Sequence, residues 1–440
     1  MNRRKFIFDV GATAAGLALA GCATRANTRK LSANDKLNIG FVGVNNRARE
    51  DLLEVAKTGE NVVALCDVDE NYLARAAKEF PSAKTYTDFR QLIDQKDIDA
   101  IVVATPDHIH AVAAVAALKS GRHCYCEKPL ARTISEVRAI TAAAEKHKSV
   151  TQIGTQIHAG NNYRRVVELV QSGVIGDVKE VHVWVNVTYG GKKWPTEFPP
   201  VPAGLHYDLW QGPIQPAPYS PEWVPFKWRN WWEFGGGALG DFGCHYMDLP
   251  FWALGLKYPI SAEAEGPERD EHSTPPWLIV RYLFPHYKTL APDGSLSAWA
   301  YKPPLALTWY HGGRQPSPDI LPSDLANKWK SGVLFIGSKG RLISDYGNHQ
   351  LIGVEKPSEL SVHVPDSIGH HKEWTEACKT GGKTTCSFDY SGPLSETALL
   401  GNVAFRTGKK IEWDAKHLKA TNAKEAEEFI QHHYRVGWSL

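Results

Sequence analysis

The feature that most constrains the fold is an alternation of short apolar runs and amphipathic stretches between residues 36 and 156. The apolar runs have the length of buried strands, and apolar residues recur at helical spacing in the stretches between them. We expect strands at 37–44, 61–66, 85–86, 100–104 and 123–126, and helices at 47–58, 70–80 and 88–94. Alternating units of this length predict a doubly wound parallel sheet with helices on both faces.

The turn after the first predicted strand reads GVNNRA over residues 43–48. It aligns with the GxGxxG dinucleotide fingerprint of Rossmann folds as Gly43, Asn45 and Ala48, so only the first glycine is kept. Asparagine departs from the pattern where the backbone approaches a pyrophosphate, although it tolerates left-handed backbone angles. The turn fits a dinucleotide site, and it also fits an ordinary strand–turn–helix connection.

Asp67 closes the second predicted strand, 24 residues after Gly43. A carboxylate at this place hydrogen-bonds a ribose 2′-hydroxyl and repels a 2′-phosphate, which favours NAD over NADP. The alternative is that Asp67 caps the following helix or turn. Two later strands also end in polar segments, TPDHIH at 105–110 and EKP at 127–129. Because ligands of open parallel sheets bind outside the carboxyl ends of the strands, we expect the nicotinamide there.

These motifs, in this order along the chain, resemble those of the glucose-fructose oxidoreductase, inositol dehydrogenase and MocA (Gfo/Idh/MocA) family. The matching segments are Asp67, TPDHIH at 105–110, EKP at 127–129, GTQ at 154–156 and GDFGCH at 240–245. The resemblance implies an α/β Rossmann domain followed by an α+β domain with a large, mostly antiparallel open sheet. The outer face of that sheet often mediates oligomerisation, so we expect a homo-oligomer.

The implied organisation is an export signal and tether at 1–35, an NAD-binding domain at 36–155 and a substrate and oligomerisation domain at 156–440. In the last of these the pattern predicts helices at 162–171 and 394–406, and strands at 178–187, 277–283, 305–310, 332–336 and 341–344. The expected cofactor-binding residues are Gly43, Asn45, Asn46, Arg47, Asp67, Thr105, Pro106, His108, His110, Glu127, Lys128 and Gln156.

Three residues are the candidates for catalysis. Oxidation of a secondary alcohol needs a group that accepts the hydroxyl proton and a cation or donor that stabilises the developing alkoxide. Lys128, at a strand end, supplies the cation. Asp241 and His245 are four residues apart and share one face if their segment is helical, so His245 can take the proton while Asp241 orients it. Without the family pattern, such a pair is equally typical of a helix surface contact or a metal half-site.

No metal is expected, although the chain has 18 histidines. Neither an HExxH motif nor a spaced set of Cys and His occurs in it. The resemblance implies that His108 and His110 lie near the nicotinamide and that they support the structure there.

Eight of the 15 tryptophans lie between residues 184 and 252, in a stretch rich in proline and glycine. We expect long loops over the site there. Two or three of these indoles can line a carbohydrate cleft, with Arg229 and Asn230 as hydroxyl partners. For most of them, packing within the loops or at a subunit interface is the better explanation.

The first 22 residues are typical of a targeting segment. Arg3 and Arg4 precede a short run rich in alanine, glycine and leucine, and LAGC at 19–22 resembles a lipoprotein processing site with Cys22 as the lipidated residue. We expect twin-arginine export to the periplasm or cell envelope, with membrane attachment only through this lipid. The alternatives are a transmembrane anchor and cleavage elsewhere.

Removal of residues 1–21 takes away three basic residues and one acidic residue, which brings the formal charge from +2 to zero. Such a balance favours a neutral sugar and gives no basic field for nucleic acid. The six remaining cysteines are not spaced like a disulfide scaffold, so most are expected to be buried free thiols.

The sequence therefore predicts an exported NAD-dependent oxidoreductase acting on a secondary alcohol of a sugar, sugar derivative or glycoside. Because free NAD is scarce outside the cytoplasm, we expect the cofactor to be bound before export and recycled in place. One alternative is an NAD-dependent glycoside hydrolase that uses transient oxidation and elimination. Another is a sugar-binding or cofactor-binding protein without activity.

Overall fold

The computed structural model describes residues 32, 34–285 and 304–440. The predicted export segment, with Arg3, Arg4 and Cys22, lies outside the described residues. In the described part, no helix is both long and apolar enough to cross a membrane.

The N-terminal part is a six-stranded sheet in the order β3-β2-β1-β4-β5-β6, with every neighbouring pair parallel. This confirms the predicted doubly wound parallel sheet. Its strands are β1 Asn38–Val42, β2 Asn61–Cys66, β3 Lys84–Tyr86, β4 Ala100–Val103, β5 His123–Cys126 and β6 Thr151–Ile153. Its helices are α1 Arg47–Lys57, α2 Glu70–Glu79, α3 Phe89–Asp94, α4 Asp107–Lys119 and α5 Ile134–His147.

Local sequence signals set the ends of these helices. Asp69 begins α2, because its carboxylate accepts the backbone N–H groups of Asn71 and Tyr72 at 2.9 and 3.4 Å. Thr133 and Glu136 form a capping box at the start of α5. These caps satisfy donors that the first helical turn leaves unpaired, and they fix where each helix leaves the sheet.

The C-terminal part is built on a nine-stranded sheet in the order β13-β12-β11-β7-β10-β9-β8-β14-β15. Its strands are β7 Val178–Val185, β8 Ser261–Glu265, β9 Leu278–Phe284, β10 Leu305–His311, β11 Gly332–Gly337, β12 Arg341–Ser344, β13 His349–Ile352, β14 Ile411–Asp414 and β15 Lys419–Ala420. Only β7 and β10 pair in parallel among these strands, so the predicted mostly antiparallel sheet is confirmed.

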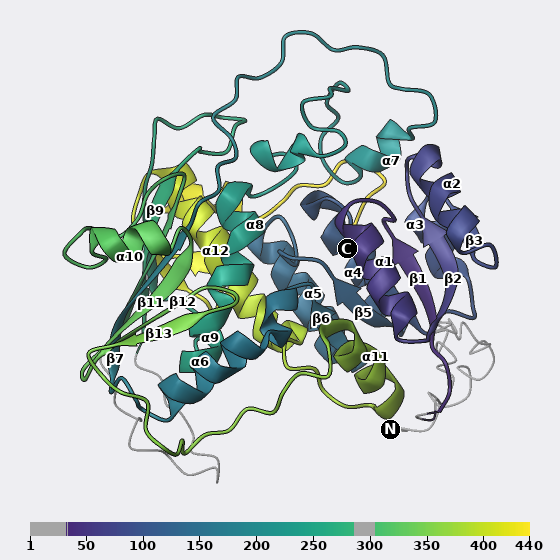
Figure 1. The fold of residues 1–440 in the computed structure, drawn as a ribbon. Helices are drawn as coiled ribbons and strands as arrows, with labels where there is room; N and C mark the ends of the chain where they lie inside the picture. The colour runs from purple at the N-terminus through teal and green to yellow at the C-terminus, as the bar shows by residue number, and fades with distance from the viewer. Residues whose placement is uncertain (1–31, 33, 286–303) are drawn as a thin grey trace, which may run out of the picture.

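Helices fill the space between the two sheets (Figure 1). The helices of the C-terminal part are η1 Gln156–Ala159, α6 Asn161–Gln171, α7 Tyr207–Gln211, η2 Lys227–Asn230, α8 Gly237–Tyr246, α9 Asp248–Leu254, α10 Ser323–Lys328, α11 His370–Thr380, α12 Phe388–Thr407, η3 Lys424–Ala426 and α13 Glu427–Ile430. Helix α12 contacts α5, α8 and β8 and so joins the two parts, whereas α11 packs on α1 of the parallel sheet.

Helix α12 begins six residues before the predicted start at 394, and it passes through Pro393. A proline in a helix removes a backbone hydrogen bond, which is why the pattern predicted a start after it. Burial compensates here, since nearly every residue from Ser391 to Phe405 is buried.

Residues 186–236, which we call the crossover loop, run from β7 over the parallel sheet to α8 (Figure 1). Most of the tryptophans in this stretch pack on one another. Trp223 and Trp231 are fully buried, and Trp194 stacks on Trp223 with ring centroids 5.0 Å apart. These indoles therefore form a small core of the loop itself.

All six cysteines in the described residues are buried free thiols. This confirms the prediction for Cys66, Cys124, Cys126, Cys244, Cys378 and Cys386.

Candidate functional site

The turn after β1 has a backbone that requires glycine at its first position. Gly43 has φ of 94°, and a Cβ atom there would overlap the carbonyl oxygen of Ala104. Asn46, just before α1, has φ of 52° and makes no side-chain cap bond. The β1–α1 turn thus approaches the end of β4 as closely as a pyrophosphate-binding turn needs, although Asn45 replaces the second glycine.

A pocket of about 830 Å³ opens beside this turn. The predicted cofactor residues that line it are Gly43, Asn45, Asn46, Asp67, Thr105 and Pro106. Tyr72, Asp88 and Phe89, which sequence reasoning missed, line its far end beyond β2 and β3.

Asp67 is one of the residues that line this pocket. Its Oδ2 accepts the backbone N–H of Val44 at 3.1 Å, and its Oδ1 accepts that of Asp69 at 3.0 Å. Burial raises the pKa of the Asp67 carboxyl to about 6. The residue that caps α2 is Asp69, so Asp67 is not the helix cap, but its bond to the Asp69 N–H does cap the turn before the helix, as the alternative allowed. Its position leaves it suited to a ribose hydroxyl.

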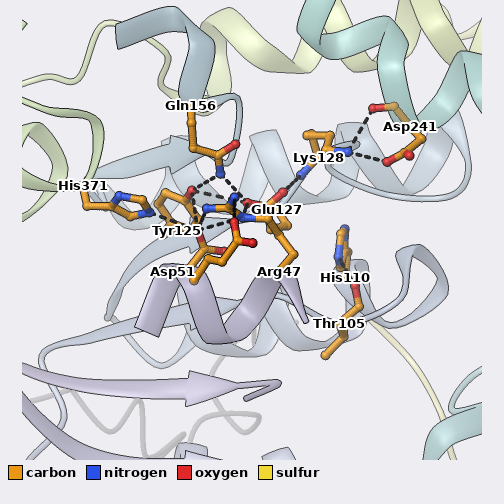
Figure 2. Close-up of polar contacts among 11 residues, drawn as sticks. Arg47, Asp51, Thr105, His110, Tyr125, Glu127, Lys128, Gln156, Asp241 and His371 are labelled. Carbon is orange, nitrogen blue, oxygen red and sulfur yellow. Dashed lines mark hydrogen bonds and ion pairs between the residues drawn. The ribbon is translucent and has the colours of Figure 1, made fainter. Parts of the chain in front are cut away.

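Lys128 and Asp241 meet where β5 ends and α8 passes (Figure 2). The Lys128 ammonium donates to the backbone carbonyl oxygen of Asp241 at 3.0 Å and to its carboxylate. Arg229 Nε lies 3.0 Å from the same carboxylate, and the Tyr189 hydroxyl donates to its other oxygen at 3.0 Å. Burial alone would raise the pKa of Asp241, but Lys128 and Arg229 hold it well below its usual range.

His245 follows Asp241 by one turn, because residues 237–246 form helix α8, which meets the condition under which the two share a face. Its imidazole is half-buried, and Nδ1 has no hydrogen-bond partner within the described part of the chain. Burial and the nearby Lys128 charge lower its pKa well below the usual value. The imidazole is therefore neutral at physiological pH, and a neutral imidazole has one acceptor nitrogen.

Asp107 is a buried acid that sequence reasoning placed in a motif but gave no role. Its side chain is 3% exposed at the start of α4. Burial, together with the charge of Asp241, raises its pKa to about 7, against the opposing effect of Arg229 and Lys128. The site thus combines two cations, one fixed carboxylate and one acid that titrates near neutral pH.

Glu127 lies behind Lys128 in a second polar cluster (Figure 2). The Gln156 side-chain amide donates to Glu127 Oε1 at 2.6 Å, and the Tyr125 hydroxyl lies 3.4 Å from the same atom. Burial and the charge of Asp51 raise the pKa of Glu127 to about 8. A Cβ atom at Gly154 would overlap the Glu127 carboxylate, so a larger residue there would displace that carboxylate.

Arg47 joins this cluster and does not line the pocket where it was predicted to bind the cofactor. Its guanidinium donates to Asp51 at 2.7 Å and lies 3.5 Å from Glu127. His371, from α11, contacts the same Asp51 carboxylate at 3.0 Å. Burial raises the pKa of Asp51, but His371 and Arg47 together lower it below its usual value. Glu127, Gln156 and Arg47 therefore brace the end of β5 from behind.

The two histidines of the predicted nicotinamide region contact backbone carbonyl groups. His108 Nε2 lies 2.8 Å from the oxygen of Trp210, and His110 Nδ1 lies 2.8 Å from that of Pro129. Burial lowers the pKa of His108 to about 3 and that of His110 to about 4. His108 thereby ties the crossover loop to α4, and His110 ties α4 to the residue after Lys128. No group of three or more metal-ligating side chains occurs in residues 34–285 and 304–440.

Comparison with known families agrees with this arrangement. One family model, described as oxidoreductase family with an NAD-binding Rossmann fold, matches residues 37–155, and the model of the same family's C-terminal alpha/beta domain matches residues 159–295. The chain belongs to the Gfo/Idh/MocA oxidoreductase family. Its parallel sheet is thus an NAD-binding Rossmann fold, and the glycine turn, Asp67 and the pocket fit that cofactor.

Relatives of this Gfo/Idh/MocA protein include both dehydrogenases and a hydrolase. Inositol 2-dehydrogenase of Salmonella typhimurium is 33% identical over 150 residues, which are 33% of this chain and 45% of that protein. Alpha-N-acetylgalactosaminidase of Shewanella oneidensis is 26% identical over 203 residues, which are 40% and 44%. The chain thus matches less than half the length of these curated relatives.

Among solved structures, a levoglucosan dehydrogenase in complex with NADH and levoglucosan has a similar fold. It superposes with a TM-score of 0.59 at 18% identity, over 86% of this chain and 99% of that one.

Proposed function

We propose that this protein is an exported NAD-dependent oxidoreductase that transfers hydride between a secondary alcohol of a sugar, sugar derivative or glycoside and a tightly bound nicotinamide cofactor. The observation that carries the proposal is the cluster of Lys128, Asp241 and His245 beside the NAD-binding Rossmann fold. The sugar relatives support the substrate class.

Lys128 is the group that binds the reacting oxygen. An ammonium has three N–H donors, and two of those on Lys128 point to Asp241. The third is left for a substrate hydroxyl or carbonyl, where the positive charge stabilises an alkoxide. Arg229 and Tyr189 hold Asp241 on its other sides, so the ammonium has a fixed position before substrate arrives.

His245 is the group that takes the hydroxyl proton when alcohol is oxidised. Its neutral imidazole accepts a proton at one ring nitrogen and returns it in the reverse reaction. NAD supplies the hydride acceptor when it is bound. Asp241 serves as a positioning residue, because it fixes Lys128 and lies one helical turn from His245.

A second candidate is an NAD-dependent glycoside hydrolase, and the similarity to an alpha-N-acetylgalactosaminidase favours it. In that reaction, oxidation of a ring hydroxyl acidifies the hydrogen on the neighbouring carbon. The aglycone then leaves by elimination, water adds, and the retained hydride is returned to the ring. The same lysine and histidine would serve both reactions, so the products distinguish them.

One experiment separates the candidates. The protein lacking residues 1–21 is purified, and part of it is denatured and assayed for released nicotinamide. The native part is incubated with a panel of sugars and glycosides, while reduced cofactor, oxidised sugar and free aglycone are followed. Oxidised sugar with reduced cofactor supports the oxidoreductase, and aglycone release without net reduction supports the hydrolase. If the protein holds no bound NAD and turns over none of the substrates, both candidate functions are refuted.

Export is proposed from the sequence alone. Arg3 and Arg4 would direct the folded protein to the twin-arginine route, and Cys22 would carry the lipid that holds it in the cell envelope. Cell fractionation of the Arg3→Lys, Arg4→Lys double variant tests the route, and incorporation of labelled fatty acid into Cys22→Ala tests the anchor. Unchanged export and unchanged labelling would contradict the two proposals.

A further inference from the structure

Residues 431–440, the C-terminal segment, lie against the Rossmann fold (Figure 1). Trp438 in this segment lines the pocket described above, next to Phe89 and Asp88. The Trp438 and Phe89 rings have centroids 6.1 Å apart, and the Arg90 guanidinium lies 4.7 Å above the Trp438 ring. A chain segment from far along the sequence therefore completes the wall of the cofactor pocket.

The C-terminal segment is held in place by directed contacts. The Arg435 guanidinium donates to the carbonyl oxygens of Gly212 and Asp208 at 2.6 and 2.7 Å. On the other side, the Tyr434 hydroxyl donates to Glu136 of α5 at 2.8 Å. These bonds join the segment to both the crossover loop and the Rossmann helices, so the position of Trp438 is built into the fold.

The crossover loop forms the rest of the cover. Its residues at the pocket are Leu205, Leu209, Trp210, Val224 and Pro225. Backbone hydrogen bonds fix this loop to the end of β2, with Glu70 N–H donating to Gly204 and His206 N–H donating to Val68, both at 2.9 Å. The pocket thus has a polar floor of strand ends and an apolar cover.

The cover lies over the adenosine end of the site. In Rossmann folds the carboxylate after the second strand binds the adenosine ribose, and the pyrophosphate lies at the first turn. Asp67 and Gly43 mark these two positions here. Trp438 lies beyond Asp67, beside residues that follow β3, where the adenine base would extend.

We propose that Trp438, supported by the Arg435 contacts, stacks on the adenine of NAD and, with the crossover loop, keeps the cofactor bound between turnovers. Stacking on an indole stabilises a bound flat base. To leave the pocket, the base would have to displace Trp438 or the crossover loop. The inference rests on the proposed function, because it assigns the residues that would retain the cofactor in that cycle.

The test measures cofactor release and not turnover. The purified protein is loaded with NADH and mixed with excess NAD, and release is followed by nicotinamide fluorescence. Trp438→Ala is expected to release NADH about tenfold faster or more, and Trp438→Phe to be intermediate, since base stacking on an aromatic ring is of this strength. Equilibrium binding of AMP, which contains only the adenosine end, is expected to weaken by a similar factor.

Trp277→Ala is the matched control. Trp277 is also a half-buried indole with an arginine above it, Arg314 at 4.1 Å, but it does not line the pocket. Its variant is expected to release NADH at the wild-type rate. Arg435→Gln provides a second variant, which loosens the C-terminal segment without changing the indole, and it is also expected to speed release.

Release rates and AMP affinities equal to wild type in Trp438→Ala and Arg435→Gln would overturn the inference. That outcome leaves the proposed reaction standing, because sugar turnover with loaded cofactor is measured separately. Conversely, if the wild-type protein turns over no sugar while Trp438→Ala still releases NADH faster, that result would refute the proposed reaction and support the role of Trp438 in retaining the cofactor.

Discussion

The ammonium nitrogen of Lys128 and the backbone carbonyl oxygen of Asp241 lie 3.0 Å apart, although 113 residues separate them in the chain. This hydrogen bond joins the end of β5 in the Rossmann fold to α8 in the C-terminal part. A lysine with nine-tenths of its side chain buried is thereby fixed between the Rossmann fold and the C-terminal part.

Lys128→Ala is expected to lower turnover by about a thousandfold, since a positioned cation and its proton contribute roughly 10²–10⁴ to such steps. Initial rates on the best sugar of the panel provide the measurement, and NAD content checks that the site still forms. Lys119→Ala, at an exposed lysine of α4, is the control and should retain the wild-type rate. Turnover within tenfold of wild type would show that Lys128 is not the polarising group.

Tyr189→Phe is expected to reduce turnover about tenfold and to leave the protein folded. The change removes the hydrogen bond to Asp241 Oδ2, which is worth roughly 1.5–3 kcal/mol because its acceptor is charged. Asp241 would then hold Lys128 less rigidly, so the rate constant is expected to fall more than the substrate affinity. The measurement is kcat and KM side by side; a change in KM alone would place Tyr189 in substrate binding instead.

Glu127→Gln is expected to change how stability depends on pH. The folded-state pKa of Glu127, raised to about 8 by burial, lies above the usual carboxyl value, so the folded protein binds the proton more tightly than the unfolded chain. The contribution of this group is fully present below the unfolded pKa and is lost as pH rises toward 8. Its slope is at most about 1.4 kcal/mol per pH unit.

Urea unfolding of wild type and Glu127→Gln between pH 5 and 9 checks this prediction. Glutamine keeps the shape of the side chain and does not titrate. The difference in the free energy of unfolding, variant minus wild type, should therefore rise with pH up to about pH 8 and then stay constant. The groups that face Glu127 are Asp51, Arg47, Tyr125, Lys128 and Gln156, and all are kept in both proteins. Parallel curves throughout would mean that Glu127 is ionised in the folded state.

Asp67→Ser is expected to shift cofactor preference toward NADP. The variant loses the carboxylate that repels a 2′-phosphate, so the ratio of the Kd values for NADP and NAD should fall by at least about tenfold. Asp69→Asn is the control, because it removes a charge at the same pocket while keeping a good helix cap. An equal shift in both variants would indicate a general charge effect and no specific role for Asp67.

The first five strands and first three helices of the Rossmann fold could be predicted closely, because its buried strands are continuous apolar runs, whereas α4, α5 and β6 were not predicted. The strands 61–66 and 123–126 begin and end where the pattern placed them. The start of α12 was placed too late, since its buried face outweighs the effect of Pro393, which no local pattern reveals.

The site was predicted less evenly. Lys128 and Asp241 were brought together only by the family resemblance, because spacing along the chain says nothing about a contact over 113 residues. Tyr189 and Trp438 were missed for the same reason, as both lie in irregular segments without periodicity. The turn motif led to the prediction that Arg47 binds the cofactor. Instead, Arg47 pairs with the buried carboxylate of Asp51, four residues later on α1.

Because Trp438 lies near the end of the chain, it joins the pocket late during protein synthesis. The last Rossmann strand is complete at residue 153, whereas the indole that covers the pocket is added at residue 438. At about 5–20 residues per second, roughly 15–60 s separate the two. Because the crossover loop is added soon after that strand, the pocket lacks the wall that Trp438 supplies for most of this interval, and the proposed cover is complete only at its end.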